Sequence, residues 1–178
     1  MTKILTVIKA AEISRDVTIP STIRYRPLPA ALEHVVNHAL PSVFRIVDQP
    51  ESFPCRKCLQ DGKVGERMEL LSYDPWLGDC PYRQPGPIFV HAEPKCDLAE
   101  FPPGAPVPEQ QSKRQLSVRA FDGNHMMVGF DTIDGQTLVK RAEDFFKQTG
   151  ADRAEYIHVH YAGPGCFAVR LDRGLGSE

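Results

Sequence analysis

The sequence carries almost no net charge: its 178 residues include 21 Lys and Arg against 23 Asp and Glu, a formal charge of −2. General nucleic-acid binders and binders of anionic membranes need a basic excess, so this balance argues against both kinds of partner. Long hydrophobic runs are lacking too. The apolar run 4–8 ends at Lys9, too short for a signal peptide, and no stretch approaches the ~18 apolar residues of a membrane span. We therefore expect a cytoplasmic protein.

Cysteine is too sparse, at five in the chain, for a disulfide framework, and the odd number fits thiols in a reducing compartment. Internal repeats of solenoid length are absent from the sequence. Proline is abundant: 16 occur, about twice the average usage, and half of them lie between Pro81 and Pro108. The length, with 42% hydrophobic and 25% charged residues, predicts a single domain over residues 1–178.

Alternation of apolar and polar residues indicates β-strands along most of the chain. We predict strands at 3–9, 42–47, 67–73, 88–91, 115–122, 125–131, 156–161 and 166–172. Asp122-Gly123, between two alternating runs, is typical of a hairpin turn. The sequence therefore predicts a mainly antiparallel sheet.

Helical spacing of apolar residues indicates two helices. One covers 30–40, and the other runs from an N-cap at Asp134 to Gln148, with Gly150 as the stop. The Pro-rich segment at about 94–112 shows no periodicity and is predicted as a long loop, either a flap over a site, a mobile excursion or a surface loop without a role. The expected fold class is α+β.

Polar side chains gather on one face of the predicted strands, because strand side chains alternate. His158 and His160 lie opposite Ile157 and Val159, while Phe167, Val169 and Leu171 are assigned to the core face of the next strand. If all strands share one sheet, several basic residues converge on its polar face. These are His91, Arg119, His158, His160 and Arg170.

His158-Val159-His160 places two imidazoles on the same face, about 6.5–7 Å apart at Cα. This spacing suits half of a site for a divalent metal ion such as zinc, with His91, Glu93 or Cys166 completing it. Two other interpretations stay open. One imidazole acts as a general base near neutral pH, or both are solvent-facing strand residues.

Arginine and aromatic residues indicate a binding site for a small anionic molecule. The candidate ligand-binding residues are Arg83, Arg119, His91 and Tyr82. The loop containing Trp76, Tyr82 and Arg83 would then wall a pocket. Equally open are surface ion pairs for the arginines and an anchoring role for the loop aromatics.

Cys55-Arg56-Lys57-Cys58 is a CxxC motif without a clear context. A zinc knuckle needs a second pair of ligands, and the sequence has no second CxxC. A redox dithiol should open a helix after a strand, whereas Pro54 precedes this motif. Because neighbouring cations lower a thiol pKa, a reactive Cys55 stays open beside structural zinc and an ordinary loop.

Two blocks of sequence carry a family resemblance. The first holds FPCRKCL (53–59), LSYDP (71–75), CPYR (80–83) and GPIFVH (86–91), and the second holds SVRAFD (117–122) and IHVHYAGPGCFA (157–168). Together they resemble a bacterial family known as domain of unknown function 1203, over roughly 53–173. Cys80 stands where the family has Ser and Tyr161 where it has Asn. The resemblance implies a small single-domain protein without an established activity, and it draws attention to Cys55, Arg83, His158, His160 and Cys166.

These observations predict a small-molecule- or metal-binding protein, with an enzyme as one form of it, whose His/Arg site lies on a sheet face. The candidate catalytic residues are His158, His160 and Cys55, and the candidate metal ligands are His158 and His160. One alternative is a non-catalytic anion- or protein-binding module with structural cysteines. Another is a thiol redox protein that uses Cys55 and Cys58.

Overall fold

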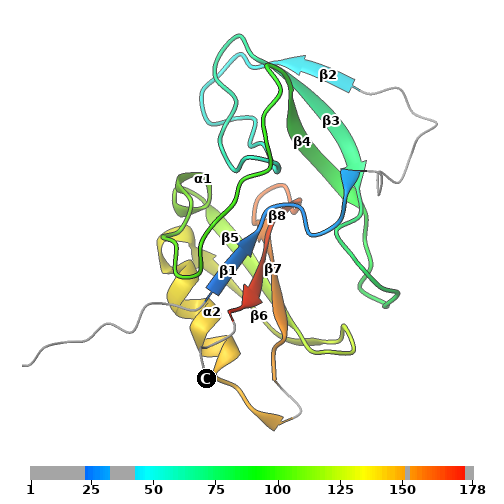
Figure 1. Ribbon diagram of the computed structural model, residues 1–178, viewed down its shortest axis with the longest axis vertical. Helices are drawn as coiled ribbons and strands as arrows, with labels where there is room; N and C mark the ends of the chain where they lie inside the picture. Colours follow the sequence, from blue (N-terminus) through cyan, green and yellow to red (C-terminus); the bar gives the residue numbers. More distant parts are fainter. Residues whose placement is uncertain (1–22, 33–42, 151–152, 175–178) are drawn as a thin grey trace, which may run out of the picture.

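The computed structural model describes residues 23–32, 43–150 and 153–174, which form two antiparallel sheets and two short α-helices (Figure 1). The larger sheet has the order β1-β8-β7-β5-β6. Its strands are β1 (Ile23–Arg26), β5 (Gln115–Phe121), β6 (Met127–Asp134), β7 (Tyr156–Tyr161) and β8 (Phe167–Arg173). The smaller sheet contains β2 (Val43–Ile46), β3 (Arg67–Tyr73) and β4 (Gly86–Glu93). The α+β prediction is confirmed, with two sheets in place of one.

The larger sheet and its helix follow the predicted pattern closely. The hairpin at Asp122-Gly123 joins β5 to β6, and Asp134 caps the next segment by accepting a hydrogen bond from the Gln136 N–H at 2.9 Å. That segment is a 3₁₀ turn, η2 (Gly135–Thr137), followed by α2 (Leu138–Phe146). Gly150 has φ 73°, the left-handed conformation expected just beyond a helix.

Two predicted elements lie outside the described residues, and the predicted loop at 94–112 ends in a helical turn. The strand at 3–9 and most of the helix at 30–40 belong to the undescribed part of the chain. Within the predicted loop at 94–112, the structure has a single helical turn, α1 (Glu109–Ser112). A helix of one turn is too short to show the apolar periodicity by which longer helices are found.

The main core lies between α2 and one face of the larger sheet. Leu116 and Val118 of β5 and Ile157 and Val159 of β7 are buried there against Leu138, Ala142 and Phe145. Burying each large apolar side chain contributes about 1.5–3 kcal/mol. This face is the one that the alternation predicts, and the opposite face, with His158 and His160, is turned toward the smaller sheet and its loops.

A β-bulge changes the predicted face of one residue. Val159 pairs with Val169 but His160 pairs with Phe167, so Ala168 is the extra residue on β8. A bulge moves the side chains beyond it to the other face. Phe167 therefore packs against His158 and His160, with ring centroids 5.4 and 6.0 Å away, and the prediction that it shares the core face with Val169 is wrong.

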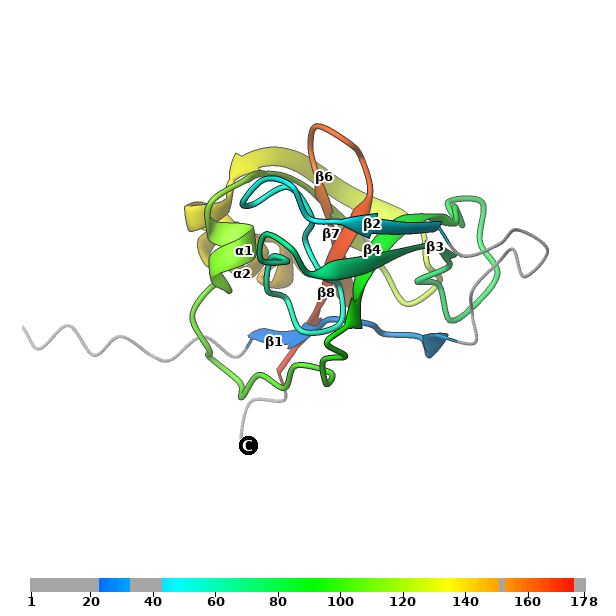
Figure 2. The ribbon, with the colours of Figure 1, turned by 90° about the horizontal axis from the view of Figure 1, so that it is seen from above.

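The Pro-rich segment connects the two sheets and covers the edge of β1 (Figure 2). The Gly104 N–H donates to the Ile23 carbonyl at 3.2 Å, and Phe101 packs edge-on against Tyr25 with centroids 5.5 Å apart. At its start, the Ala99 N–H donates to the Lys57 carbonyl at 2.9 Å. An edge strand offers unpaired backbone groups, so this segment shields β1 while it holds the CxxC turn.

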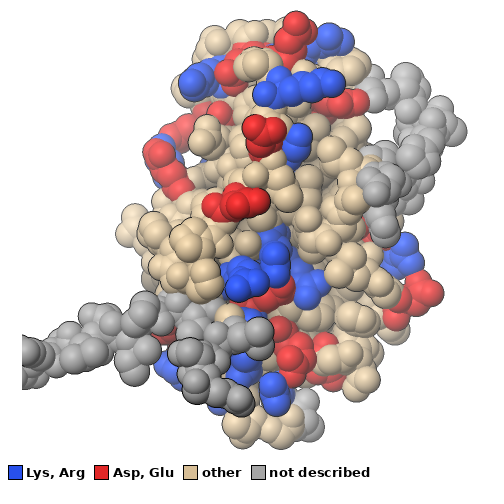
Figure 3. All heavy atoms as spheres, in the orientation of Figure 1, with Lys and Arg blue, Asp and Glu red and all other residues tan. Residues whose placement is uncertain are grey.

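Basic and acidic side chains are interspersed over the face shown in Figure 3. Charge on this face therefore singles out no area as a binding surface. None of the helices in the described ranges is long and apolar enough to cross a bilayer.

Candidate metal centre

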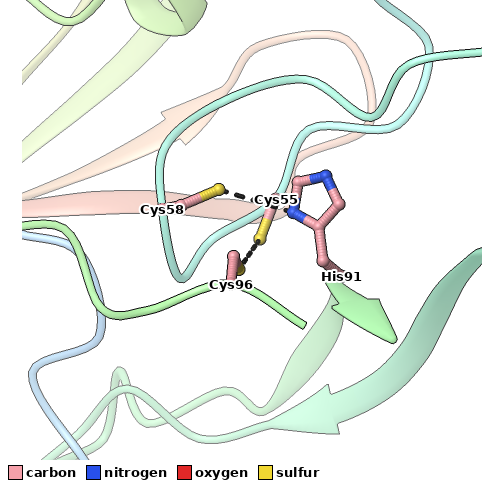
Figure 4. Close-up of side chains that lie close together, drawn as sticks. All are labelled: Cys55, Cys58, His91 and Cys96. Atoms are coloured by element: carbon pink, nitrogen blue, oxygen red, sulfur yellow. Dashed lines mark hydrogen bonds between the residues drawn. The ribbon is translucent and has the colours of Figure 1, made fainter. Parts of the chain in front are cut away.

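Four potential metal ligands meet beside the smaller sheet (Figure 4). They are Cys55, Cys58, His91 and Cys96, and their ligand atoms all lie within 4.8 Å of one another. The first two come from the turn before β3, His91 from the end of β4, and Cys96 from the start of the Pro-rich segment. Within the described ranges, no other group of three or more His, Cys, Asp or Glu side chains has its ligand atoms this close together.

The CxxC motif lies in a tight turn fixed by backbone hydrogen bonds. Pro54 and Asp61 form an isolated bridge, and the Cys55 N–H donates to the Gln60 carbonyl at 3.0 Å. Leu59 has φ 55°, a conformation uncommon outside glycine, which reverses the chain after the second cysteine. A further bond, from the Arg56 N–H to the Phe89 carbonyl at 2.9 Å, docks the turn on β4. The turn thereby holds both thiols next to His91.

Two of the six distances between the donor atoms match the edges of a tetrahedral zinc site. Cys55 Sγ lies 3.7 Å from Cys96 Sγ, and Cys58 Sγ lies 3.4 Å from His91 Nδ1. With Zn–S of about 2.3 Å and Zn–N of about 2.0–2.1 Å, a regular tetrahedron has S···S edges of about 3.8 Å and S···N edges of about 3.6 Å. Two donor pairs therefore already lie at the spacing of zinc ligands, and all four donor atoms lie within 4.8 Å of one another.

His91 is oriented by a carboxylate on its far side. Its Nε2 lies 3.2 Å from Glu66 Oε2, while Nδ1 faces Cys58. Both side chains are mostly buried, at 8% and 21% exposed. A ligating histidine commonly donates its second ring N–H to a carboxylate, which fixes the tautomer that leaves the other nitrogen free for a metal. Glu66 is the carboxylate that accepts from Nε2, which leaves Nδ1 of His91 free to bind a metal.

The three thiols perturb each other because they are crowded together away from water. A hydrogen bond from the Cys58 thiol lowers the pKa of Cys55 to about 4, against its burial, and backbone N–H groups of Cys58, Lys57 and His91 act in the same direction. The same bond raises the pKa of Cys58, and burial raises that of Cys96. Without a metal, these interactions favour the thiolate form of one cysteine only. A divalent cation would stabilise all three cysteines as thiolates.

An ion has a route to the group from one side. Cys55 is fully buried, but Cys58 is half-buried and lines a surface hollow of about 710 Å³. The hollow is also lined by Gln60, Asp61 and the start of α1.

The predicted histidine pair lies elsewhere, in the larger sheet. His158 is 1% exposed and enclosed by rings, with Trp76 at 4.6 Å and Phe167 at 5.4 Å between centroids. Burial lowers its pKa well below the ordinary value, and its Nδ1 has no hydrogen-bond partner among the described residues. His160 lies 6.3 Å away between centroids. His91 belongs to the other sheet, so the convergence expected of a single sheet does not include it.

The other predicted ligand-binding residues line one small pocket. Tyr82, Arg83, Arg119 and His160 surround a volume of about 290 Å³, with Trp76 among the apolar lining residues. Arg83 already pairs with Asp74 and Asp79, both at 2.5 Å. Trp76, which the sequence left as either pocket wall or anchor, is both, since it is 6% exposed and packed on Phe121.

Sequence reasoning did not assemble the four ligands, although it weighed a zinc role for Cys55 and Cys58 and named His91 as a ligand in a different site. Cys96 was left as a singleton and His91 was assigned to the histidine pair. The available signal was the spacing: C-x2-C at 55–58 and H-x4-C at 91–96 provide two short pairs. A search for a second CxxC misses a second pair that begins with histidine.

The structure thus defines a two-sheet antiparallel α+β protein with a Cys3His group of metal-site geometry. Residues 52–173 match the family described as "Protein of unknown function (DUF1203)", and the chain belongs to that family, as the motifs predict. Comparisons with curated proteins and with solved structures give no match.

Proposed function

We propose that this protein binds one zinc ion through Cys55, Cys58, His91 and Cys96. The observation that carries the proposal is the gathering of four donor atoms within 4.8 Å of one another, with two donor pairs, 3.7 Å between sulfurs and 3.4 Å between sulfur and nitrogen, at the edge lengths of a zinc tetrahedron. Thiolate and imidazole ligands in tetrahedral arrangement favour zinc over magnesium or calcium, which select oxygen ligands.

The ligand set favours a structural ion over a catalytic one. Catalytic zinc sites use three protein ligands and keep a position open for water or substrate, whereas four protein ligands close the site. The ion would join three segments: the CxxC turn, the end of β4 and the Pro-rich segment that runs on to β1 and α1. Its role is to fasten the smaller sheet to the segment that spans both sheets.

The ligand-binding activity of the protein is then separate from the metal. In this proposal the zinc is structural, and a small anionic molecule would bind elsewhere, among the arginines of the larger sheet. This is the non-catalytic module with structural cysteines that the sequence left as an alternative, with a zinc ion added.

The test is the metal content of the full chain purified without a histidine tag under reducing conditions. Plasma mass spectrometry is applied to wild type, Cys58→Ser and His160→Ala, with Cys80→Ser as the matched control. Cys80 is also half-buried but packs near Trp76, outside the group. We expect about one zinc per chain in wild type, Cys80→Ser and His160→Ala, and loss of zinc in Cys58→Ser.

Three results would overturn the proposal. These are wild-type protein that takes up no zinc even when supplied with it, zinc retained at full affinity in Cys58→Ser, and zinc lost in His160→Ala with retention in Cys58→Ser. The third result would move the metal to the histidine pair. Circular dichroism of each variant checks that loss of zinc is not loss of the larger sheet.

A further inference from the structure

A second candidate binding site is the pocket beside His160, and none of the proposed zinc ligands lines it. Its floor comes from Arg119 and Phe121 of β5 with Met127 of β6, and its other wall comes from the loop that carries Trp76 and Tyr82. The volume of about 290 Å³ lies at the lower end of ligand pockets, which suits a small molecule.

The loop over this pocket is held in place by one buried carboxylate. Asp74 is 2% exposed and accepts hydrogen bonds from the Trp76 N–H at 3.1 Å and from Arg83 Nε at 2.5 Å. It therefore binds both sides of the loop at once. Trp76 also packs on Phe121 and His158, with centroids 4.9 and 4.6 Å away. A pocket walled in this way is formed before a ligand arrives, so binding orders little chain.

Arg119 is the cation of this pocket without a counter-ion. It is half-buried on β5, an inner strand of the larger sheet, and it pairs in register with His158. No side chain of the described ranges forms an ion pair or hydrogen bond with its guanidinium. Its neighbours differ: Arg83 pairs with two aspartates, and Arg170 pairs with Asp172 at 2.6 Å. A half-buried guanidinium with unused donors favours a carboxylate or phosphate.

His160 adds no charge to the pocket. Burial, with the nearby Arg119 charge, lowers the pKa of His160 to about 4, so the ring is neutral near pH 7. Its Nδ1 lies 3.0 Å from the Gly165 carbonyl oxygen, which can only accept, so Nδ1 carries the proton. The positive charge left for a ligand is that of Arg119.

The rest of the lining is apolar and largely aromatic. Trp76, Tyr82, Phe121 and Met127 face the same space, and Tyr82 meets Phe121 edge-on at 5.8 Å between centroids. Inorganic phosphate would leave these surfaces in contact with water. A flat ring attached to the anion would cover them, and contacts with aromatic rings add to the burial of apolar area.

From this combination we infer that the pocket binds a small aromatic carboxylate, whose anionic group pairs with Arg119 and whose ring packs among Trp76, Tyr82 and Phe121. The inference uses none of the proposed zinc ligands. Failure of zinc binding and failure of carboxylate binding are therefore separate results.

The chain has one tryptophan, and it lines this pocket, which gives a local reporter. The indole N–H resonance of Trp76 is followed by NMR while benzoate, its neutral counterpart benzamide, or phosphate is added to the full chain. We expect benzoate to shift this resonance and saturate near 1 mM, a typical strength for a ligand of few atoms. Benzamide and phosphate should bind at least tenfold more weakly.

The matched variants are Arg119→Gln, Arg119→Lys and the exposed Arg153→Gln. A charge-assisted bidentate pair is worth roughly a 10- to 100-fold change in affinity, so Arg119→Gln should lose that much for benzoate, Arg119→Lys less, and Arg153→Gln nothing. The inference is overturned if benzoate leaves the indole resonance unmoved, if benzamide or phosphate binds as tightly as benzoate, or if Arg119→Gln binds like wild type. The benzoate–benzamide comparison needs only wild-type protein, so it decides even if a variant misfolds.

Discussion

Replacing Glu66 by alanine should weaken zinc binding although Glu66 is not a ligand. Its Oε2 accepts two hydrogen bonds, from His91 Nε2 at 3.2 Å and from the Lys63 N–H at 2.7 Å. The first fixes the imidazole so that Nδ1 faces Cys58, and the second fixes the carboxylate itself. Alanine removes both, which leaves the ring free to turn and makes it a poorer donor to the metal.

The size of the effect follows from these contacts. Loss of such a supporting carboxylate typically weakens metal affinity by about 10- to 100-fold, or about 1.4–2.7 kcal/mol. Glu66→Gln keeps an oxygen acceptor in the same place but removes its charge. Because a charged acceptor adds roughly 1 kcal/mol to a hydrogen bond, glutamine should weaken binding by about fivefold.

The assay is competition for zinc against a coloured chelator at neutral pH, under reducing conditions. Glu93→Gln is the control. Glu93 lies two residues from His91 in sequence, but its side chain is 77% exposed and, among the described residues, forms an ion pair only with Arg67, at 3.8 Å. The reasoning is refuted if Glu66→Ala binds zinc as tightly as wild type. It is equally refuted if Glu93→Gln weakens binding as much as Glu66→Ala, because the effect would then be one of general charge.

Three further predictions concern stability. Chelation of zinc should speed amide hydrogen exchange in β2–β4 far more than in β7, because the proposed ion is tied to the smaller sheet; equal acceleration in both sheets would contradict this. Burial lowers the pKa of His160 in the folded protein from 6.5 to about 4. Between these two pH values the unfolded chain therefore binds a proton that the folded chain does not. The free energy of unfolding is full above pH 6.5 and falls as the pH drops toward 4, by at most about 3 kcal/mol. Urea unfolding of wild type and His160→Gln should differ by this slope, and parallel pH profiles would count against it. Gly135→Ala should destabilise by roughly 1–3 kcal/mol, because its Cβ would lie 1.9 Å from the Gln111 carbonyl oxygen, whereas Gly163→Ala, with nothing within 4 Å, should unfold like wild type.

Local patterns predicted the larger sheet because its strands carry their own signals. The alternation at 156–161 matches β7, and Asp122-Gly123 marks the hairpin whose turn it forms. The face of Phe167 was predicted wrongly because a bulge is a property of paired strands. The extra residue, Ala168, is recognised only when β8 is paired with β7. Strand alternation along one segment cannot show which of its own residues is left unpaired by the neighbouring strand.

The candidate metal centre could not be predicted from the sequence for a related reason. Cys55 and Cys96 are 41 residues apart, and their contact depends on how the CxxC turn docks on β4 through Phe89. No periodicity encodes that docking. The pocket is an intermediate case, since Tyr82, Arg83, Arg119 and His160 were all named as site residues, but the sequence could not tell that Arg83 is neutralised and Arg119 is not.

The two sheets differ in how much of the chain must be synthesised before each can form. All of β2, β3, β4 and the four proposed ligands lie within residues 43–96, so they are synthesised before the larger sheet is complete, but Phe167 of β8 also packs in the core of the smaller sheet. The larger sheet needs β1 to pair with β8, joining Ile23 to Arg173 across nearly the whole described chain. Such long-range pairing is slow, and until β8 has been made the edge of β7 opposite β5 has no partner strand. A chain that ends between β7 and β8 would therefore hold all four proposed ligands, but it would leave one edge of β7 open and the core of the smaller sheet without Phe167.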